Sequence, residues 1–190
     1  MALTATVHHL IITLSDVDRN VYEKLDLRIA RHPSESARYF WQRTLAYCLS
    51  YEEGIAFSKG GLSDADEPPV SIKDPTGIFV AWIDVGSPSA DRLHRASKAA
   101  RRVALFTATD RELLEREARS RKIHALDEIE VFLLQASFLD QLEQHLQKHL
   151  ELELVRTGEE LYVTLPKASG RGAPQGETIQ GTITGTRLSP

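Results

Sequence analysis

The chain has 190 residues, of which 42% are hydrophobic, and this length is sufficient for one well-packed hydrophobic core. Its formal net charge of -4, with 26% charged residues, is typical of soluble enzymes. Such a balance excludes the strongly basic overall surface of a tight, non-specific nucleic-acid binder. A nucleic acid would have to bind to a local basic patch.

The single cysteine, Cys48, cannot form an internal disulfide. The sequence contains neither a signal peptide nor an apolar run long enough to span a membrane. We therefore expect a cytoplasmic protein with no membrane partner. Gly60-Gly61 lacks the flanking spacing of a phosphate-binding loop, so no nucleotide cofactor is predicted.

The N-terminal part of the chain predicts two strands and a helix. Residues 2–14 are rich in β-branched side chains, and residues 25–30 alternate apolar and polar side chains, which indicates an antiparallel pair of strands. A helix is expected over residues 35–53. Pro33 is tolerated near a helix start, and Ser34 can cap the first amides of the helix.

The middle of the chain predicts a β-hairpin. Residues 70–73 and 78–85 are joined by Asp74-Pro75-Thr76-Gly77, a turn in which Pro fixes φ and Gly accepts a positive φ. The second strand is almost continuously apolar, as expected for a central strand that is buried on both faces.

The remaining elements alternate between helices and strands. In chain order we expect a basic helix over 90–102, a strand over 103–107, a helix from 109 to about 122, a strand over 130–134, a helix over 137–150 and a closing hairpin of 151–154 with 161–165. Residues 1–166 are therefore predicted to form a single α/β or α+β domain, with helices flanking a mixed sheet and with additional N- and C-terminal antiparallel strands. Residues 167–190 are rich in Gly, Ser, Thr and Pro, which predicts a flexible C-terminal tail.

Two carboxylates are expected to meet at the open end of the hairpin. A turn centred on Pro75 and Thr76 places Glu67 opposite Asp84, and opposed residues of an antiparallel pair lie about 5 Å apart. Like charges at this distance are unfavourable unless a cation or a proton separates them, and Mg²⁺ prefers oxygen ligands. Asp84 also ends an apolar run, where a charge is costly to bury unless it is paired or metal-bound. The alternative is that the strand ends there and exposes Asp84 to solvent.

Four segments resemble the sequence pattern of the YaeQ family, and the resemblance covers about residues 1–165. The segments are His32-Pro33-Ser34-Glu35, the loop from Asp64 to Pro68, Trp82-Ile83-Asp84-Val85-Gly86-x-Pro88 and Val103-Ala104-Leu105-Phe106-Thr107. That family is similar in fold to the PD-(D/E)XK, or restriction endonuclease-like, nucleases. The resemblance therefore implies a nuclease-like domain.

The resemblance also implies a site for Mg²⁺ or Mn²⁺. In PD-(D/E)XK nucleases a helix carboxylate and acids on two successive strands bind the metal, and Glu35, Glu67 and Asp84 match these positions here. Asp66 replaces Glu67 if the predicted register is wrong by one residue. The metal would activate water and neutralise charge on a phosphodiester. Glu35 has an alternative role, because an acid in the first helical turn is favourable to the helix dipole.

The nuclease pattern expects a lysine two positions after the second-strand acid, where Gly86 stands. The missing cation could come from helix 90–102, on which Arg95, Lys98 and Arg102 are predicted to share a face. Arg95 and Lys98 are the candidates. Arg95 would hold phosphate, and only Lys98 could also act on water. The alternative is a solvated basic helix face.

Two functions follow from these features. The first is a Mg²⁺-dependent phosphodiesterase that cleaves DNA or RNA with the three carboxylates as metal ligands. The second is a catalytically inactive nuclease-like domain with a regulatory role. It would bind nucleic acid or a protein partner through the basic helix 90–102 and the sheet surface. Gly86 favours the second function and the three acids favour the first, so enzymatic activity stays open.

Overall fold

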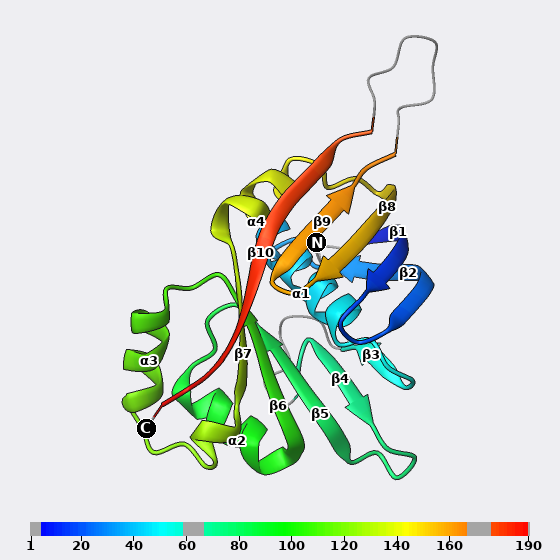
Figure 1. Ribbon diagram of the computed structural model, residues 1–190. Helices are drawn as coiled ribbons and strands as arrows, with labels where there is room; N and C mark the ends of the chain where they lie inside the picture. The colour runs from blue at the N-terminus through cyan, green and yellow to red at the C-terminus, as the bar shows by residue number, and fades with distance from the viewer. Residues whose placement is uncertain (1–4, 59–66, 167–175, 190) are drawn as a thin grey trace, which may run out of the picture. The chain divides into compact units, whose positions relative to one another are not determined.

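The computed structural model describes residues 5–58, 67–166 and 176–189 (Figure 1). The chain divides into two compact units. Unit 1 comprises Met1–Arg38 and Gln135–Ile183, and unit 2 comprises Tyr39–Leu134 and Thr184–Pro190. Within the described ranges, no helix is both long enough and apolar enough to cross a membrane.

Unit 1 contains a sheet with the strand order β2-β1-β8-β9-β10. The strands are β1 (Thr6–Asp16), β2 (Val21–Arg31), β8 (His149–Thr157), β9 (Glu160–Thr164) and β10 (Thr178–Arg187). β1 and β8 run parallel, whereas the other neighbours run antiparallel. Leu10, Ile12 and Leu14 are buried at every second position of β1, which is the period of a strand with one face in the core.

Strand β10 contradicts the predicted flexible tail over residues 178–187. Ile179 and Ile183 are buried, and β10 pairs antiparallel with β9. Between them, Gly181 lies against helix α4 (Ala136–Glu143), where an added Cβ would be 2.3 Å from the Phe138 ring. The small residues that allow this close approach are also typical of flexible tails. For that reason the composition of the segment predicted a tail. Residues 167–175 lie outside the described part of the chain.

Unit 2 contains the strand order β7-β6-β5-β4-β3, with the last residues of β10 beside β7. The strands are β3 (Ile55–Phe57), β4 (Val70–Lys73), β5 (Phe79–Val85), β6 (Ala100–Thr107) and β7 (Glu130–Leu134). β5, β6 and β7 are parallel, and β3 and β4 continue the sheet antiparallel to β5. The predicted mixed sheet and α+β class are confirmed, whereas the short strand β3 was not predicted.

Among the described residues of unit 2, three α-helices and a short 3-10 helix accompany the sheet. They are α1 (Ala37–Leu49, whose first two residues belong to unit 1), α2 (Ala90–Ala99), α3 (Arg111–Arg119) and η2 (Leu126–Glu128). Leu93 of α2 and Leu114 of α3 share a buried cluster with Trp82, Val103 and Val131 of β5, β6 and β7. α2 and α3 therefore cover one face of the parallel strands, and this face carries the candidate site.

Two helices end earlier than predicted, and a strand begins within the predicted range of each. β6 begins at Ala100, which pairs with Phe79 of β5, so Arg102 lies on a strand. The prediction that Arg102 shares a helix face with Arg95 and Lys98 is therefore wrong. α4 likewise ends at Glu143, and β8 begins at His149 beside β1. After α2, sheet pairing outweighs local helix propensity, and after α4 turns at residues 144–145 separate the helix from the strand.

Candidate functional site

Asp84 lies near the carboxyl end of β5, which has β4 on one side and β6 on the other. Alternate residues of a strand point to opposite faces, so Asp84 shares a face with Trp82, which packs under α2. Only 3% of the Asp84 side chain is exposed. The alternative in which β5 ends in solvent at Asp84 is therefore wrong. A carboxylate buried to this extent requires a partner.

Arg92, in the first turn of α2, is that partner. Its Nε donates to Oδ2 of Asp84 at 2.6 Å, and Nε1 of Trp82 donates to the same oxygen at 3.1 Å. The guanidinium carbon lies 5.5 Å from the centroid of the Trp82 ring. Nη2 of Arg92 donates to the backbone carbonyl of Glu67 at 2.9 Å. Arg92 thus joins the strand acid to the segment that contains the other predicted acid.

The carboxylate of Glu67 faces a different cation. Its Oε1 accepts from Nζ of Lys73 at 3.2 Å, and its Oε2 accepts from Oγ of Ser58 at 3.2 Å. Nζ of Lys73 also lies 4.5 Å from the centroid of the Phe79 ring. A cavity of ≈ 230 Å³ is lined by Glu67, Lys73, Ser58 and Ser71, among others. Asp84 with Arg92 and Glu67 with Lys73 therefore form two separate ion pairs in the same region of unit 2.

The predicted hairpin register, with Glu67 directly opposite Asp84, is wrong. Val70, the first residue of β4, pairs with Ile83, so Glu67 precedes the paired part of the strand. A bulge between the last two residues of β4 shifts the ladder. Such a bulge has no clear signature in this sequence. Arg92, and not direct pairing, links the Glu67 segment to Asp84.

Glu35 belongs to unit 1 and precedes helix α1. Its side chain is buried, and its Oε2 accepts from the backbone N–H of His32 at 3.2 Å. Its own N–H donates to the carbonyl of His32 at 2.9 Å, and Nε of Arg31 donates to the Glu35 carbonyl at 3.0 Å. The expectation that Glu35 lies in the first helical turn is wrong, because these contacts form a turn before the helix.

Gly86 occupies a position that suits glycine alone. Its φ is +78°, a left-handed conformation that strains a residue with a Cβ. Its N–H donates to the carbonyl of Phe106 at 2.9 Å, which fixes this backbone beside β6. The lysine expected by the nuclease pattern would therefore be strained here.

The candidate replacement cations, Arg95 and Lys98, are both exposed on α2. Arg102 lies on β6, where its Nε pairs with Oε2 of Glu130 at 2.7 Å. The cations that contact the two predicted acids of unit 2 are Arg92 and Lys73, and neither was a candidate. A signal for Arg92 was present in the sequence. A helix that follows a parallel strand begins near the carboxyl end of that strand, so residues in its first turn lie close to the strand's last side chains.

The assignment of Glu35, Glu67 and Asp84 as ligands of Mg²⁺ or Mn²⁺ stays a prediction. Over residues 5–58, 67–166 and 176–189, no group of three or more His, Cys, Asp or Glu side chains is placed to hold a metal ion. Asp66 lies outside these ranges. Asp84 already shares one carboxylate oxygen between Arg92 and Trp82, so the arrangement does not fit a metal ion while Arg92 stays in place.

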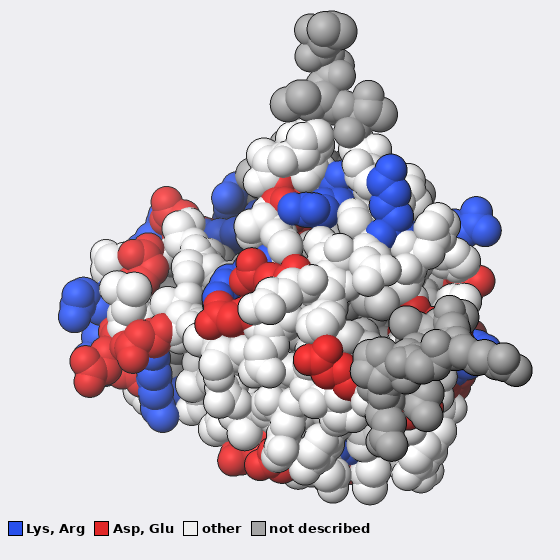
Figure 2. All heavy atoms as spheres, turned by 90° about the horizontal axis from the view of Figure 1, so that it is seen from above, with Lys and Arg blue, Asp and Glu red and all other residues white. Residues whose placement is uncertain are grey.

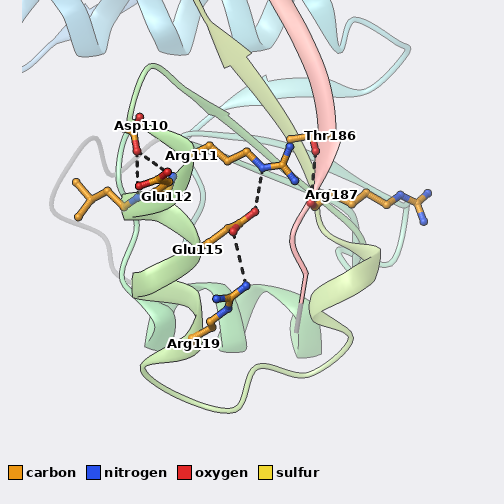
Figure 3. Close-up of polar contacts among 8 residues, drawn as sticks. Asp110, Arg111, Glu112, Glu115, Arg119, Thr186 and Arg187 are labelled. Carbon is orange, nitrogen blue, oxygen red and sulfur yellow. Dashed lines mark hydrogen bonds and ion pairs between the residues drawn. The ribbon is translucent and has the colours of Figure 1, made fainter.

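The charged residues that the structure describes are mixed in sign. On the face drawn in Figure 2, their Lys and Arg side chains lie interspersed with Asp and Glu. On α3, Arg111 and Arg119 reach Glu115 from either side, at 2.9 and 3.7 Å (Figure 3). Asp110 caps this helix by accepting from the backbone N–H of Glu112 at 2.9 Å. Acids therefore balance many of the basic side chains close to them.

The fold and the site define a mixed α+β protein with a buried acid–arginine pair at the end of a central strand. The family model described as "YaeQ protein" matches residues 1–171. The chain therefore belongs to the YaeQ family. It is 38% identical over 112 residues to the YaeQ proteins of Escherichia coli (strain K12) and Salmonella typhi. Those alignments span 58% of this chain and 61% of each relative.

Two crystal structures share the fold. The YaeQ protein from Xanthomonas axonopodis pv. citri superposes with a TM-score of 0.81 at 24% identity, covering 98% of this chain and 100% of that chain. The YaeQ protein from Pseudomonas syringae superposes with a TM-score of 0.76 at 28% identity, covering 93% of this chain and 95% of that chain. The mixed α+β architecture is thus common to these proteins.

Proposed function

We propose that the chain is a nuclease-like domain that binds nucleic acid without hydrolysing it. The likeness to nucleases rests on the resemblance of the four sequence segments. The observation that carries the loss of chemistry is the 2.6 Å contact between Arg92 and Asp84. An acid whose charge is neutralised by a partly buried guanidinium offers little to a metal ion. Gly86 supports the same conclusion, because its backbone conformation disfavours a lysine.

Arg95 and Lys98 are the proposed phosphate contacts. They are exposed and lie one and two helical turns beyond Arg92 on α2. Contacts from Arg and Lys to phosphate position a nucleic acid without reading its sequence. The net charge of -4 provides no overall attraction to a polyanion, so we expect weak binding that is lost at high salt.

Fluorescence anisotropy with labelled single-stranded DNA, duplex DNA and RNA at low salt tests this proposal. The double variant R95Q/K98Q is expected to bind at least about 10-fold more weakly than the wild type. For this variant, the slope of log K against log salt concentration should be smaller in magnitude by about 1 for each phosphate contact that is lost. The matched control R116Q/K122Q removes the same charge from exposed positions of α3 and the residues after it, and should bind like the wild type.

Two results would contradict the proposal. Absence of binding by the wild type to all three polymers would reject a nucleic-acid partner and leave a protein partner to be sought. Equal loss of binding in both double variants would show that general charge, and not this helix face, carries the interaction.

A Mg²⁺-dependent phosphodiesterase is the second candidate function. One observation favours it: the Asp84 carboxylate and the Glu67 carbonyl both contact a single cationic group. In this proposal Glu35, Glu67 and Asp84 would hold Mg²⁺ or Mn²⁺, which would activate water. Titration of the wild type and D84A with Mg²⁺ or Mn²⁺ tests it. Asp84-dependent thermal stabilisation together with cleavage of DNA or RNA would favour this candidate over the first.

A further inference from the structure

We infer that Arg92 excludes divalent cations from Asp84, so that replacing Arg92 creates a divalent-cation site. The inference rests on the proposed function in one respect, namely that Asp84 does not bind metal in the native chain. It goes further by naming the residue responsible and by predicting a gain of binding.

The guanidinium of Arg92 has surroundings that would also suit a metal ion. Its Nε contacts Oδ2 of Asp84 at 2.6 Å, and its Nη2 contacts the carbonyl oxygen of Glu67 at 2.9 Å. A carboxylate and a backbone carbonyl are both ligands for hard divalent cations, which complete their shell with water. The region between these two oxygens is therefore suited to positive charge, and in the native chain the guanidinium supplies it.

Arg92 has two advantages over a free cation. It is covalently part of the chain, and its planar group donates to both oxygens at once. It is also held in place by its helix, since Oγ of the N-cap residue Ser89 accepts from the Arg92 N–H at 3.3 Å. A metal ion would have to displace this tethered group and leave a guanidinium that is only 19% exposed without its acceptor.

Removing the guanidinium reverses this balance. Asp84 then keeps a buried carboxylate that lacks its cation, and any small cation that enters recovers the lost interaction. The carboxylate of Glu67 is held elsewhere by Lys73 and Ser58, so we expect few protein ligands. The expected affinity is weak, with a Kd on the order of 10⁻⁴–10⁻³ M, as for protein sites with few charged ligands.

The test compares four proteins, each titrated with Mn²⁺ and followed by calorimetry and by the thermal unfolding midpoint. They are the wild type, R92Q, the control R116Q and the double variant D84N/R92Q. R92Q is expected to bind one Mn²⁺ and to gain thermal stability in a saturable way. R116Q loses the same charge from an exposed position of α3 and should resemble the wild type, with no binding. D84N/R92Q should also not bind, because it lacks the carboxylate.

The inference is overturned if the wild type binds Mn²⁺ through Asp84, or if folded R92Q does not bind it. Should R92Q be unfolded without metal, a circular dichroism titration replaces calorimetry, and failure of Mn²⁺ to refold the variant would also overturn the inference. Nucleic-acid binding by the metal-free wild type is a separate measurement. If the metal-free wild type does not bind nucleic acid, the proposed function is rejected, whereas the inference about Arg92 is not affected.

Discussion

At the scale of single residues, the pairing of Asp84 with Arg92 has the largest energetic consequence. The side chains are 3% and 19% exposed, so solvent screens their attraction little. Removing one member of a buried ion pair leaves an uncompensated charge, whereas replacing both with apolar residues of similar size is often close to neutral. The two kinds of substitution therefore have different expected outcomes.

We predict that R92M lowers the free energy of unfolding by about 3–5 kcal/mol, because it leaves the Asp84 carboxylate buried without its cation. The double variant D84L/R92M should recover most of this loss. Urea unfolding of both proteins provides the measurement. K98M, at an exposed position of the same helix, is the control and should change stability by less than about 0.5 kcal/mol. A double variant no more stable than R92M would indicate that the site cannot accept apolar side chains.

Asp74 has the second distinctive residue-scale property. The hydroxyl of Thr76 donates to its carboxylate at 2.6 Å, and this hydrogen bond is the main reason that the pKa of Asp74 is lowered. The backbone N–H groups of Ile78 and Thr76 lower the pKa further. A lowered pKa in the folded state means that the ionised carboxylate stabilises the turn. This contribution is fully present above the unfolded-state value of about 3.9 and is lost as the pH falls through the folded-state pKa.

We predict that D74N melts at a lower temperature than the wild type at pH 7, and that the difference narrows as the pH falls below about 4. T76V should raise the pKa of Asp74, as measured by NMR titration of its carboxyl carbon. An unchanged pKa in T76V would show that the backbone donors alone maintain the shift.

At the scale of elements, β10 carries two glycines with different surroundings. A Cβ at Gly181 would lie 2.3 Å from the Phe138 ring, whereas a Cβ at Gly185 would lie 3.8 Å from the Phe132 ring, an ordinary contact. Gly181 therefore permits a close approach between strand and helix, and Gly185 does not need to be glycine for steric reasons.

We predict that G181A lowers the free energy of unfolding by about 1–3 kcal/mol, because the methyl group forces Phe138 or the strand to move. G185A is the matched control on the same strand and should be neutral or slightly stabilising. Chemical unfolding of the two variants under the same conditions provides the measurement. Equal effects would show that strand propensity, and not the contact with Phe138, determines the cost.

Elements with clear periodicity could be predicted from the sequence, and their relations in space could not. β7 has the predicted bounds, and the turn at Thr157 and Gly158 joins β8 to β9 as expected. Asp84 was correctly singled out as a charge that needs a partner. Its partner, Arg92, was missed because the candidate cations were chosen as basic residues that share a face of the helix. Distance from the carboxyl end of β5 would have indicated Arg92. The offset of Glu67 was missed for two reasons. The turn is one residue longer than predicted, with the Asp74 N–H bonded to the Ile78 carbonyl, and a bulge between Ile72 and Lys73 shifts the register by one more residue.

At the scale of the whole molecule, β10 contributes residues to both units. Residues 178–183 belong to unit 1, and residues 184–187 belong to unit 2, where Leu188 also joins the buried cluster of α2 and α3. The boundary predicted at residue 166 therefore removes buried side chains from both units.

We predict that a chain shortened to residues 1–166 is destabilised in both units, because β9 loses a strand neighbour and the α2–α3 cluster loses Leu188. Hydrogen exchange should show faster exchange of amides in β9 and in β7 than in the full chain. The substitution L188A in the full chain is the matched comparison. It should affect unit 2 alone, with a cost of about 2–5 kcal/mol.

The division of β10 between the units also affects how the protein is made. On the ribosome, the other strands of both units emerge before β10, so neither unit can complete its sheet until β10 follows them. Until residue 188 has left the exit tunnel, the unpaired side of β9 and the apolar surface that Leu188 covers are available to other chains. We therefore expect nascent chains of this protein to depend on chaperones until β10 has been synthesised.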